Sequence, residues 1–344
     1  MKRRGWTVLL GAVLVALLTW QSLSVKVAYV ALGPGPTVDT LGSVDTKTGE
    51  QRIITAAPEY STESTGELQL VTVRVYDEVE LARAIFYWLS DEYAVVPRDL
   101  IYPEDQTDEQ IAQQQTEQWT QSQSSAETAA LRVLGQPVRV VVTQITPGSA
   151  AEGVLAAGDV ITAVDGTPVI SAGDLAGQIS AEPPGTEREL TFTRGGKTEK
   201  AKVTPGDGGQ GSAFLGVSLE QQQDNPFDVK INTESLDIGG PSAGLMFALG
   251  IIDRVDAVDL TGGINIAGTG EIDDDGVVGP IGGVAEKVIA AKDNGATVFL
   301  TPEANCPAAK GNVPDGLTLV KVGTLDEALN ALAALRDGKQ PPLC

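Results

Sequence analysis

The sequence contains no histidine, and this absence excludes more chemistry than any other feature of its composition. Ser-His-Asp triads, Cys-His dyads, HExxH zinc sites and histidine proton shuttles all require that residue. Only two cysteines occur, which is too few for a cysteine-rich zinc or iron–sulfur site. We therefore expect no metal and no cofactor, and any catalysis must depend on Ser, Thr, Lys, Asp, Glu or Tyr.

Basic side chains and phosphate-binding loops are also scarce. The chain has 24 basic against 46 acidic side chains and a formal charge of -22, so nucleic acid is a poor candidate partner. No GxxxxGK[ST] motif is present, which argues against ATP binding. A GxGxxG match at residues 206–211 precedes a strand-like segment rather than a helix, and it therefore predicts an interdomain linker.

The amino end combines a basic cluster with a long charge-free stretch. Residues 1–4 read MKRR, and no charge follows from Gly5 to Val25, which as a helix would be about 30 Å long. With Trp6 and Trp20 near the two ends, residues 1–25 predict a single transmembrane helix. The expected location is a cell membrane, with the amino end cytoplasmic and the catalytic domain extracytoplasmic. The alternative is a cleaved signal peptide.

The two cysteines, Cys306 and Cys344, are expected to form a disulfide, because an exported chain meets an oxidising environment. Such a bond would close a loop of about 39 residues and stabilise the fold by roughly 4 kcal/mol. Two unrelated buried thiols are the alternative.

Residues 26–136 predict a membrane-proximal α/β region. A strand is expected at 67–75 and a helix at 81–89. Capping boxes at Thr107 with Gln110 and at Ser124 with Glu127 predict two further helix starts, the second helix ending at Gly135. The glutamine-rich run between these boxes predicts a solvated helix face.

From residue 138 the pattern changes to strand, turn and short helix. Residues 138–145, the PGSAA turn at 147–151, the helix at 172–180 and the RGGK hairpin at 194–197 follow in the order of a bacterial PDZ domain, which this segment resembles. The resemblance implies a PDZ-like β-rich domain at 137–206 that binds peptides, often by their carboxyl ends, through strand addition. A carboxylate-binding loop has no clear match at its start, and FLGV at 214–217 fits better but follows the domain. A spacer or a gate over the active site is the alternative role.

A strand-like segment at 229–232 is followed by GPSAG at residues 240–244, the sharpest chemical motif in the chain. Proline suits a first helical position, and the amino end of a helix favours negative charge. Ser242 is therefore a candidate nucleophile, with the backbone of Gly240, Pro241 and Ala243 around a developing oxyanion. The alternative is a tight turn into a core helix.

A serine nucleophile needs a base, and without histidine the candidate is a neutral lysine. Lys287 falls beside the apolar stripe that contains Val284, Val288 and Ala291, whereas Glu286 falls on the polar side of the same helix. Its burial against that stripe would lower its pKa.

Together GPSAG, TGEI at 269–272 and PIGG at 280–283 before Lys287 resemble the proteolytic domain of the Lon family of Ser-Lys proteases. The resemblance covers roughly 211–335 of a proteolytic domain expected at 211–338, ahead of a tail at 339–344, and makes Thr269 the hydroxyl that orients the lysine. Two departures stand out: the acidic residue before the serine is replaced by Gly239, with Asp237 two residues earlier, and no ATPase module precedes the domain.

The expected fold is thus α+β and multidomain: a transmembrane helix, a membrane-proximal α/β region, a PDZ-like domain and a Lon-type α/β proteolytic domain. The resemblance implies an ATP-independent serine endopeptidase acting on extracytoplasmic peptides or proteins, with PDZ-assisted substrate selection and assembly into a homo-oligomer. The alternative is an inactive scaffold that binds peptide termini at the membrane. Residues 273–276, DDDG, predict a charged hairpin turn rather than an EF-hand.

Overall fold

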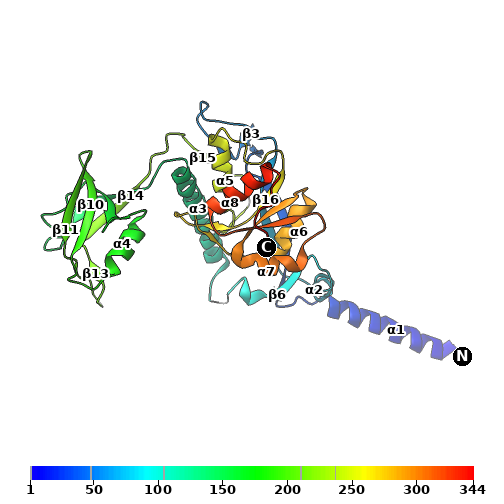
Figure 1. The fold of residues 1–344 in the computed structure, drawn as a ribbon. Coiled ribbons are helices and arrows are strands. Elements are labelled where there is room, and N and C mark those ends of the chain that lie inside the picture. Colours follow the sequence, from blue (N-terminus) through cyan, green and yellow to red (C-terminus); the bar gives the residue numbers. More distant parts are fainter. Residues whose placement is uncertain (1, 47–48, 104, 210, 237) are drawn as a thin grey trace. The chain divides into compact units, whose positions relative to one another are not determined.

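A computed structural model describes residues 2–46, 49–103, 105–209, 211–236 and 238–344 (Figure 1). The chain forms two compact units, each described here by itself. The first unit contains residues 1–124, 230–272 and 277–344, and the second contains residues 125–229 and 273–276. The first unit is therefore discontinuous in sequence, because the second is inserted into it.

A mixed six-stranded sheet forms the centre of the first unit, in the order β20-β19-β16-β5-β1-β6. Strand β16 pairs in parallel with β5 and with β19, and β19 pairs in parallel with β20, whereas β1 is antiparallel to β5 and β6. The strands are β1 (Tyr29–Asp39), β5 (Glu67–Tyr76), β6 (Ala94–Pro97), β16 (Asn265–Gly268), β19 (Val298–Pro302) and β20 (Thr318–Val322). The three parallel strands are short and largely apolar, as expected for strands buried on both faces.

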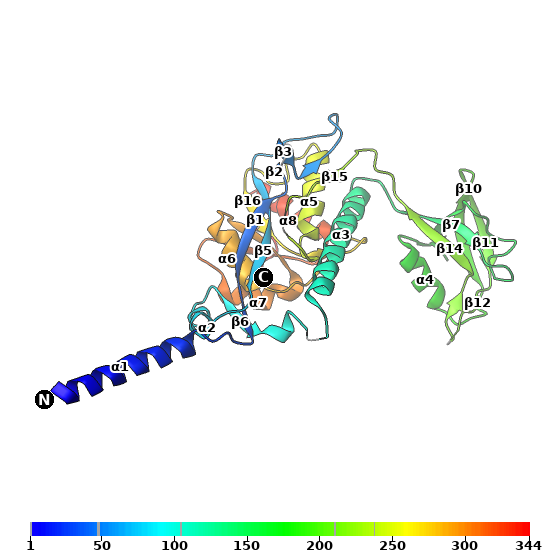
Figure 2. The ribbon, with the colours of Figure 1, turned by 180° about the vertical axis from the view of Figure 1, so that it is seen from behind.

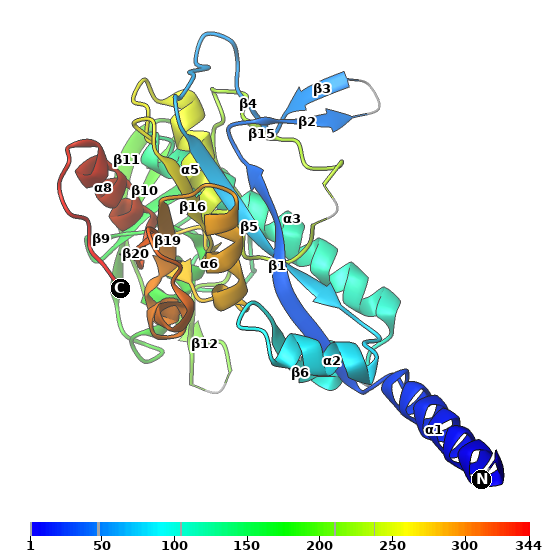
Figure 3. The same cartoon turned by 90° about the vertical axis from the view of Figure 1, so that its right-hand side faces the viewer.

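Helices cover both faces of this sheet (Figure 3). On one face, α6 shares a core cluster with Val71, Ala267 and Phe299. On the other face lies α5, whose Met246 side chain leaves no room for a Cβ at Gly268. The helices are α2 (Leu81–Trp88), α3 (Asp108–Val133), α5 (Gly244–Val255), α6 (Val284–Asp293), α7 (Cys306–Ala309) and α8 (Leu325–Arg336), with 3-10 turns η1 (Arg98–Leu100), η2 (Glu303–Asn305) and η3 (Lys310–Asn312).

Three short antiparallel strand pairs complete the described part of the first unit. One is the long-range pair of β4 (Ile54–Thr55) with β15 (Lys230–Ile231), and the other two are hairpins, β2 (Ser43–Thr46) with β3 (Gly49–Arg52) and β17 (Glu271–Ile272) with β18 (Val278–Gly279). The last pair flanks residues 273–276, so the charged sequence there is a hairpin turn, as predicted.

The second unit is a β-rich domain with one complete helix of its own, α4 (Ala172–Ser180), at the predicted position. Its sheet has the order β11-β10-β8-β7-β14, with β9 paired to β8. The strands are β7 (Arg139–Ile145), β8 (Val160–Val164), β9 (Thr167–Pro168), β10 (Arg188–Arg194), β11 (Lys197–Val203) and β14 (Val217–Gln222), beside a β12 (Gly206–Asp207) and β13 (Ala213–Phe214) hairpin. Leu175, Ile179, Leu190 and Phe192 belong to its core.

The predicted membrane span is wrong. Lys2–Leu23 does form a helix, α1, but within the described residues no helix combines the length and the apolar character that a membrane crossing requires. The prediction rested on the lack of charge between Gly5 and Val25, whereas Thr19, Gln21 and Ser22 make the last turns polar. The single-pass membrane location that followed from this span falls with it.

The segment boundaries also differ from those predicted at 26–136, 137–206 and 211–338. Strands β1 and β5 and the part of α3 up to Ser124 belong to the sheet and helix layers of the first unit, and β14 completes the sheet of the second. One continuous helix, α3, replaces the two expected after residue 107. It begins with the predicted capping box, in which Thr107 and Gln110 exchange hydrogen bonds of 2.9 and 3.2 Å, but it runs through Ser124 and Glu127 without a break.

Candidate active site

A cavity of about 650 Å³ opens in the first unit beside Ser242 and Lys287. Its wall is formed by the second half of β5, by one face of α3, and by the turns that precede α5 and α6. The lining residues are Pro36, 70–75, Gln115, Gln118, Trp119, 238–240, Ser242, Ala243, Gly282 and Lys287. Both residues proposed from the sequence for the chemistry therefore face one space large enough for part of a peptide.

The turn that carries Ser242 is held against α3 by two hydrogen bonds. The Gly240 N–H donates to the Gln115 carbonyl at 3.2 Å, and Ser122 Oγ donates to the Pro241 carbonyl at 2.9 Å. Gly240 has φ +87°, a conformation that favours glycine. Helix α5 begins two residues after Ser242, so the serine stands at the positive end of that helix.

Backbone donors for an oxyanion are fewer than the sequence suggested. Pro241 has no N–H, and the Gly240 N–H already donates to Gln115. The N–H of Ala243 makes no backbone hydrogen bond within the described part of the chain, and it lies at the start of α5. Of the three residues proposed to surround an oxyanion, Ala243 is the one with a free donor.

Lys287 contacts both hydroxyl groups proposed for the site. Its Nζ lies 2.7 Å from Ser242 Oγ and 2.9 Å from Thr269 Oγ1. Thr269 Oγ1 in turn donates to the Ser242 carbonyl at 3.0 Å, which also accepts the Gly270 N–H at 2.9 Å. Thr269 thus links the lysine to the backbone of the serine, and the structure brings together all three residues that the sequence singled out.

Burial gives Lys287 an unusual acidity. The residue is 3% exposed, and desolvation lowers its pKa from 10.5 to about 7, while the negative charge of Glu271 acts in the opposite direction. A lysine with such a pKa is neutral in a large fraction of molecules near neutral pH. A neutral amine can accept the Ser242 proton across the same 2.7 Å separation.

Glu286 does not lie on a polar face as the helical pattern suggested. It is 6% exposed, and desolvation raises the pKa of its carboxyl group. Its Oε2 would lie 3.5 Å from a Cβ placed at Gly283, next to Val73 of β5. The polar side of α6 is therefore covered near its amino end.

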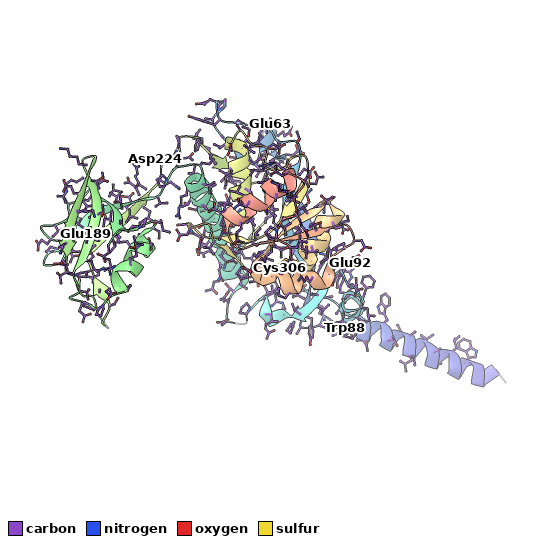
Figure 4. The ribbon with its side chains drawn as sticks, viewed as in Figure 1. Glu63, Trp88, Glu92, Glu189, Asp224 and Cys306 are labelled. Atoms are coloured by element: carbon purple, nitrogen blue, oxygen red, sulfur yellow. A yellow bond between two sulfur atoms is a disulfide. The ribbon has the colours of Figure 1, made fainter. Side chains whose placement is uncertain are left out.

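Cys306 and Cys344 form a disulfide with an S–S distance of 2.01 Å. Cys306, labelled in Figure 4, begins α7. The carboxyl-terminal segment lies along β20, where Lys321 N–H donates to Pro342 O at 2.9 Å and Cys344 N–H to Leu319 O at 3.2 Å. The disulfide and these hydrogen bonds together fix the tail.

The sequence did not predict four residues of this site, on β5 and α3: Val73, Gln115 and Trp119 line the cavity, and Ser122 supports the nucleophile turn behind it. Their segment was assigned to a region outside the proteolytic domain. A signal did exist in α3, where the buried positions Ile111, Trp119, Ser122 and Ala126 recur at helical spacing and indicate one packed face. Asp237 lies outside the described residues.

The second unit has its own groove, of about 350 Å³, lined by residues of α4, by residues 212–217 and by Leu219. Figure 2 labels α4 and β14, which contribute to its wall. Leu175, Ile179, Leu215 and Leu219 line it. The FLGV sequence at 214–217, which is predicted above to follow the domain, therefore lines this groove. Gly216 has φ +82°, and a Cβ there would lie 2.1 Å from Ser149 Cβ, so only glycine fits.

Comparison with known protein families assigns both parts of the chain. Residues 212–335 match the Lon protease (S16) C-terminal proteolytic domain, and residues 109–204 match the PDZ domain family. The chain therefore carries a serine-peptidase domain of the Lon type together with a PDZ domain. The structure places residues up to Ser124 of the PDZ match in the first unit and adds β14 to the second.

Curated relatives agree with the assignment of the proteolytic segment. Lon protease 2 of Bacillus subtilis is 35% identical over 117 residues, which are 34% of this chain and 21% of that protein. Lon protease of Lachnoclostridium phytofermentans is 34% identical over 116 residues, or 33% of this chain and 14% of that one. The chain thus spans about a fifth or less of these relatives.

Among solved structures, the PDZ domain of an SdrC-like protein from Listeria monocytogenes is 27% identical and covers 23% of this chain and 85% of that one. Its TM-score is 0.23, too low to support an argument about the fold. The PDZ assignment therefore depends on the family match.

Proposed function

We propose that this chain is an ATP-independent serine endopeptidase in which Ser242 is the nucleophile and Lys287 the general base. One observation carries the proposal: a lysine that is 3% exposed, with a pKa of about 7, lies 2.7 Å from a serine hydroxyl in a cavity. A scaffold without activity would not need a lysine desolvated against a serine. Perturbed ionisable groups in a cavity are the usual mark of a catalytic site.

The reaction follows from this arrangement. Ser242 Oγ attacks the scissile carbonyl carbon as its proton passes to neutral Lys287, and the carbonyl oxygen becomes an oxyanion near the Ala243 N–H. The C–N bond then breaks, and the lysine gives its proton to the leaving amine, which leaves an acyl ester on Ser242. Water attacks that ester after losing a proton to Lys287, and the serine regains its proton when the acid is released.

Thr269 has a positioning role in the proposal. Its hydroxyl accepts from Lys287 and donates to the Ser242 carbonyl, which fixes the amine relative to the turn that carries the nucleophile. The 344 residues contain no GxxxxGK[ST] motif, and this supports independence from ATP. The disulfide supports substrates outside the reducing cytoplasm, because disulfides persist in oxidising compartments.

The experiment is hydrolysis of quenched fluorescent peptides and of an unfolded protein, with and without ATP. Ser242→Ala and Lys287→Arg should abolish cleavage, since guanidinium keeps its proton. Ser43→Ala, an exposed serine on β2, is the matched control and should retain activity. Activity in Lys287→Arg, or a requirement for ATP, would contradict the proposal.

The PDZ domain is proposed to select substrates by binding their carboxyl ends in the groove beside α4. Apolar side chains line this groove, which suits an apolar terminal residue. Ala176→Trp should fill the groove and weaken cleavage of a protein substrate more than that of a short peptide, whereas Ala157→Trp, on an exposed turn, should not. Equal losses on both substrates would point to a structural or gating role.

Sedimentation of the same preparations tests whether the chain forms the homo-oligomer that its Lon-type domain suggests.

A further inference from the structure

Strand β5 has an unpaired edge beside the active site. Its first half pairs with β16 from Glu67 to Leu70, but β16 ends at Gly268. On its other side, β5 pairs with β1 as far as Tyr76. Among the described strands none pairs with residues 71–75 on the side that β16 leaves, and these residues line the cavity that contains Ser242.

The backbone polarity of this edge can be read from neighbouring hydrogen bonds. Glu67 N–H donates towards the β16 side, to Ile264 O, while Leu68 O accepts from Thr40 N–H on the β1 side. Because backbone groups alternate in direction along a strand, the N–H and C=O groups of Val71 and Val73 face the open side. An extended peptide can pair with them.

Where β16 ends, the chain turns towards the nucleophile. Gly270 N–H donates to the Ser242 carbonyl, and Leu245 N–H to Gly270 O at 3.1 Å. Residues 269–270 therefore bend towards the start of α5 instead of continuing along β5. A peptide on the open edge would take the place of a continued β16 and pass Ser242.

Arg74 is a charged side chain close to this edge. Its side chain lies on the opposite face of β5 from Val71 and Val73, whose side chains approach α6, and it lines the cavity with Gln115 and Trp119. Arg74 is exposed and forms no ion pair or side-chain hydrogen bond within the described residues. Most other described arginines do form ion pairs, such as Arg98 with Asp77 and Arg132 with Asp275.

No described residue that lines the cavity carries a carboxylate, although the whole chain has a formal charge of -22. The charged side chains in the wall are those of Arg74 and Lys287, and the lysine has a pKa of about 7. Among the described residues of the wall, Arg74 is therefore a cation without an acidic neighbour. It lies three residues beyond Val71, roughly 10 Å along the strand.

We propose that the open edge of β5 binds the substrate as an added strand and that Arg74 selects an acidic side chain a few residues from the scissile bond. The inference rests on the proposed peptidase function and names a substrate class for it. Arg74 acts here as a specificity-determining residue, through a charge-assisted hydrogen bond that a carboxylate can accept.

The test compares kcat/KM for a set of peptides that place Asp, Asn or Lys at each of the four positions on either side of one scissile bond. Wild type should prefer Asp to Asn at one position by about 3- to 10-fold, less at high salt. Arg74→Glu should reverse the order to Lys over Asp at that same position. Arg83→Gln, an exposed α2 arginine outside the cavity, is the control and should keep the wild-type preference.

The outcomes separate this inference from the peptidase function. If wild type cleaves the peptides but shows no charge preference, or if Arg74→Glu does not reverse it, the selectivity is refuted while the function stands. If no peptide is cleaved, the function fails first. A preference that vanishes when the peptide carboxyl end is amidated would show that Arg74 binds a terminal carboxylate instead. Methylation of one backbone nitrogen at alternate positions should reduce kcat/KM, and no effect at any position would refute strand addition.

Discussion

Replacing Lys287 by methionine tests the physical basis of the site as well as its chemistry. Methionine is similar in length and has no charge, so it can occupy the dry space between Val284 and Val288 without a proton equilibrium. The variant should be inactive, because Ser242 loses its base at 2.7 Å. Lys292→Met, on the same helix but partly exposed, should remain active.

The stability of the wild type and that of Lys287→Met should respond differently to pH. In the unfolded chain the lysine has a pKa near 10.5, while in the folded chain it has a pKa of about 7. Between these values the unfolded state binds the additional proton, so the free energy of unfolding rises with pH by about 1.4 kcal/mol per unit. Well below pH 7 the lysine is protonated in both states. Burial of its charge then lowers the free energy of unfolding by the full cost of the pKa shift, about 5 kcal/mol.

The methionine variant lacks this cost at every pH. Its advantage over wild type should therefore be largest at pH 7 or below and should shrink by about 3 kcal/mol between pH 7 and 9.5. The two lost hydrogen bonds to Ser242 and Thr269 shift the difference by a constant and do not alter its slope. Peptidase activity of wild type should rise through a single ionisation near pH 7.

The assay is denaturant unfolding followed by tryptophan fluorescence across this pH range. All four tryptophans lie within residues 1–124, so the signal reports the unit that contains Lys287. A stability difference that stays constant from pH 7 to 9.5 would show that Lys287 is not desolvated in the folded state. In that case the reasoning that makes it a base at neutral pH would fail.

Three further predictions concern other contacts. Thr269→Val should lower kcat by about 10- to 100-fold with little change in KM, since it removes the group that positions Lys287; an unchanged kcat in steady-state kinetics would exclude that role. Thiol labelling of the unreduced, denatured protein should find neither Cys306 nor Cys344 free, and Cys306→Ser should lower stability by about 4 kcal/mol; two labelled thiols would refute the bond. Gly216→Ala should destabilise the PDZ unit by about 1–3 kcal/mol, measured by hydrogen exchange over residues 139–203, because of its φ of +82° and the Ser149 contact; Gly173→Ala is the unstrained control, and equal protection in both would contradict the prediction.

Local sequence patterns predicted an element correctly where its conformation depends only on residues close by in the sequence. The helix expected at residues 172–180 and the capping box at Thr107 are both present, because each depends on neighbours within one or two turns. The apolar stripe of α6 likewise placed Lys287 beside Val284 and Val288. Periodicity could not place Glu286, because α6 packs against β1 and β5, more than two hundred residues earlier in the chain.

The amino-terminal helix shows a different limit. The basic cluster, the lack of charge between Gly5 and Val25 and the two tryptophans predict a span, but none of these measures how apolar the helix is. A spanning helix needs about 20 predominantly apolar residues, and in α1 Thr19, Gln21 and Ser22 follow the apolar run. A helix was correctly expected, but its environment was not.

The discontinuity of the proteolytic unit explains why half of the cavity wall was missed. Ser122 Oγ and the Pro241 carbonyl are 119 residues apart in sequence, and the second unit occupies most of that interval. Motif order alone favours a domain that begins near residue 211, because all the chemical motifs follow that residue. The structure also requires earlier residues in the same unit. Strand β16 pairs in parallel with β5, and the Ser242 turn exchanges hydrogen bonds with α3. A truncated chain that begins at residue 211 would therefore keep Ser242, Thr269 and Lys287 but lose β5, Arg74 and the support of the nucleophile turn.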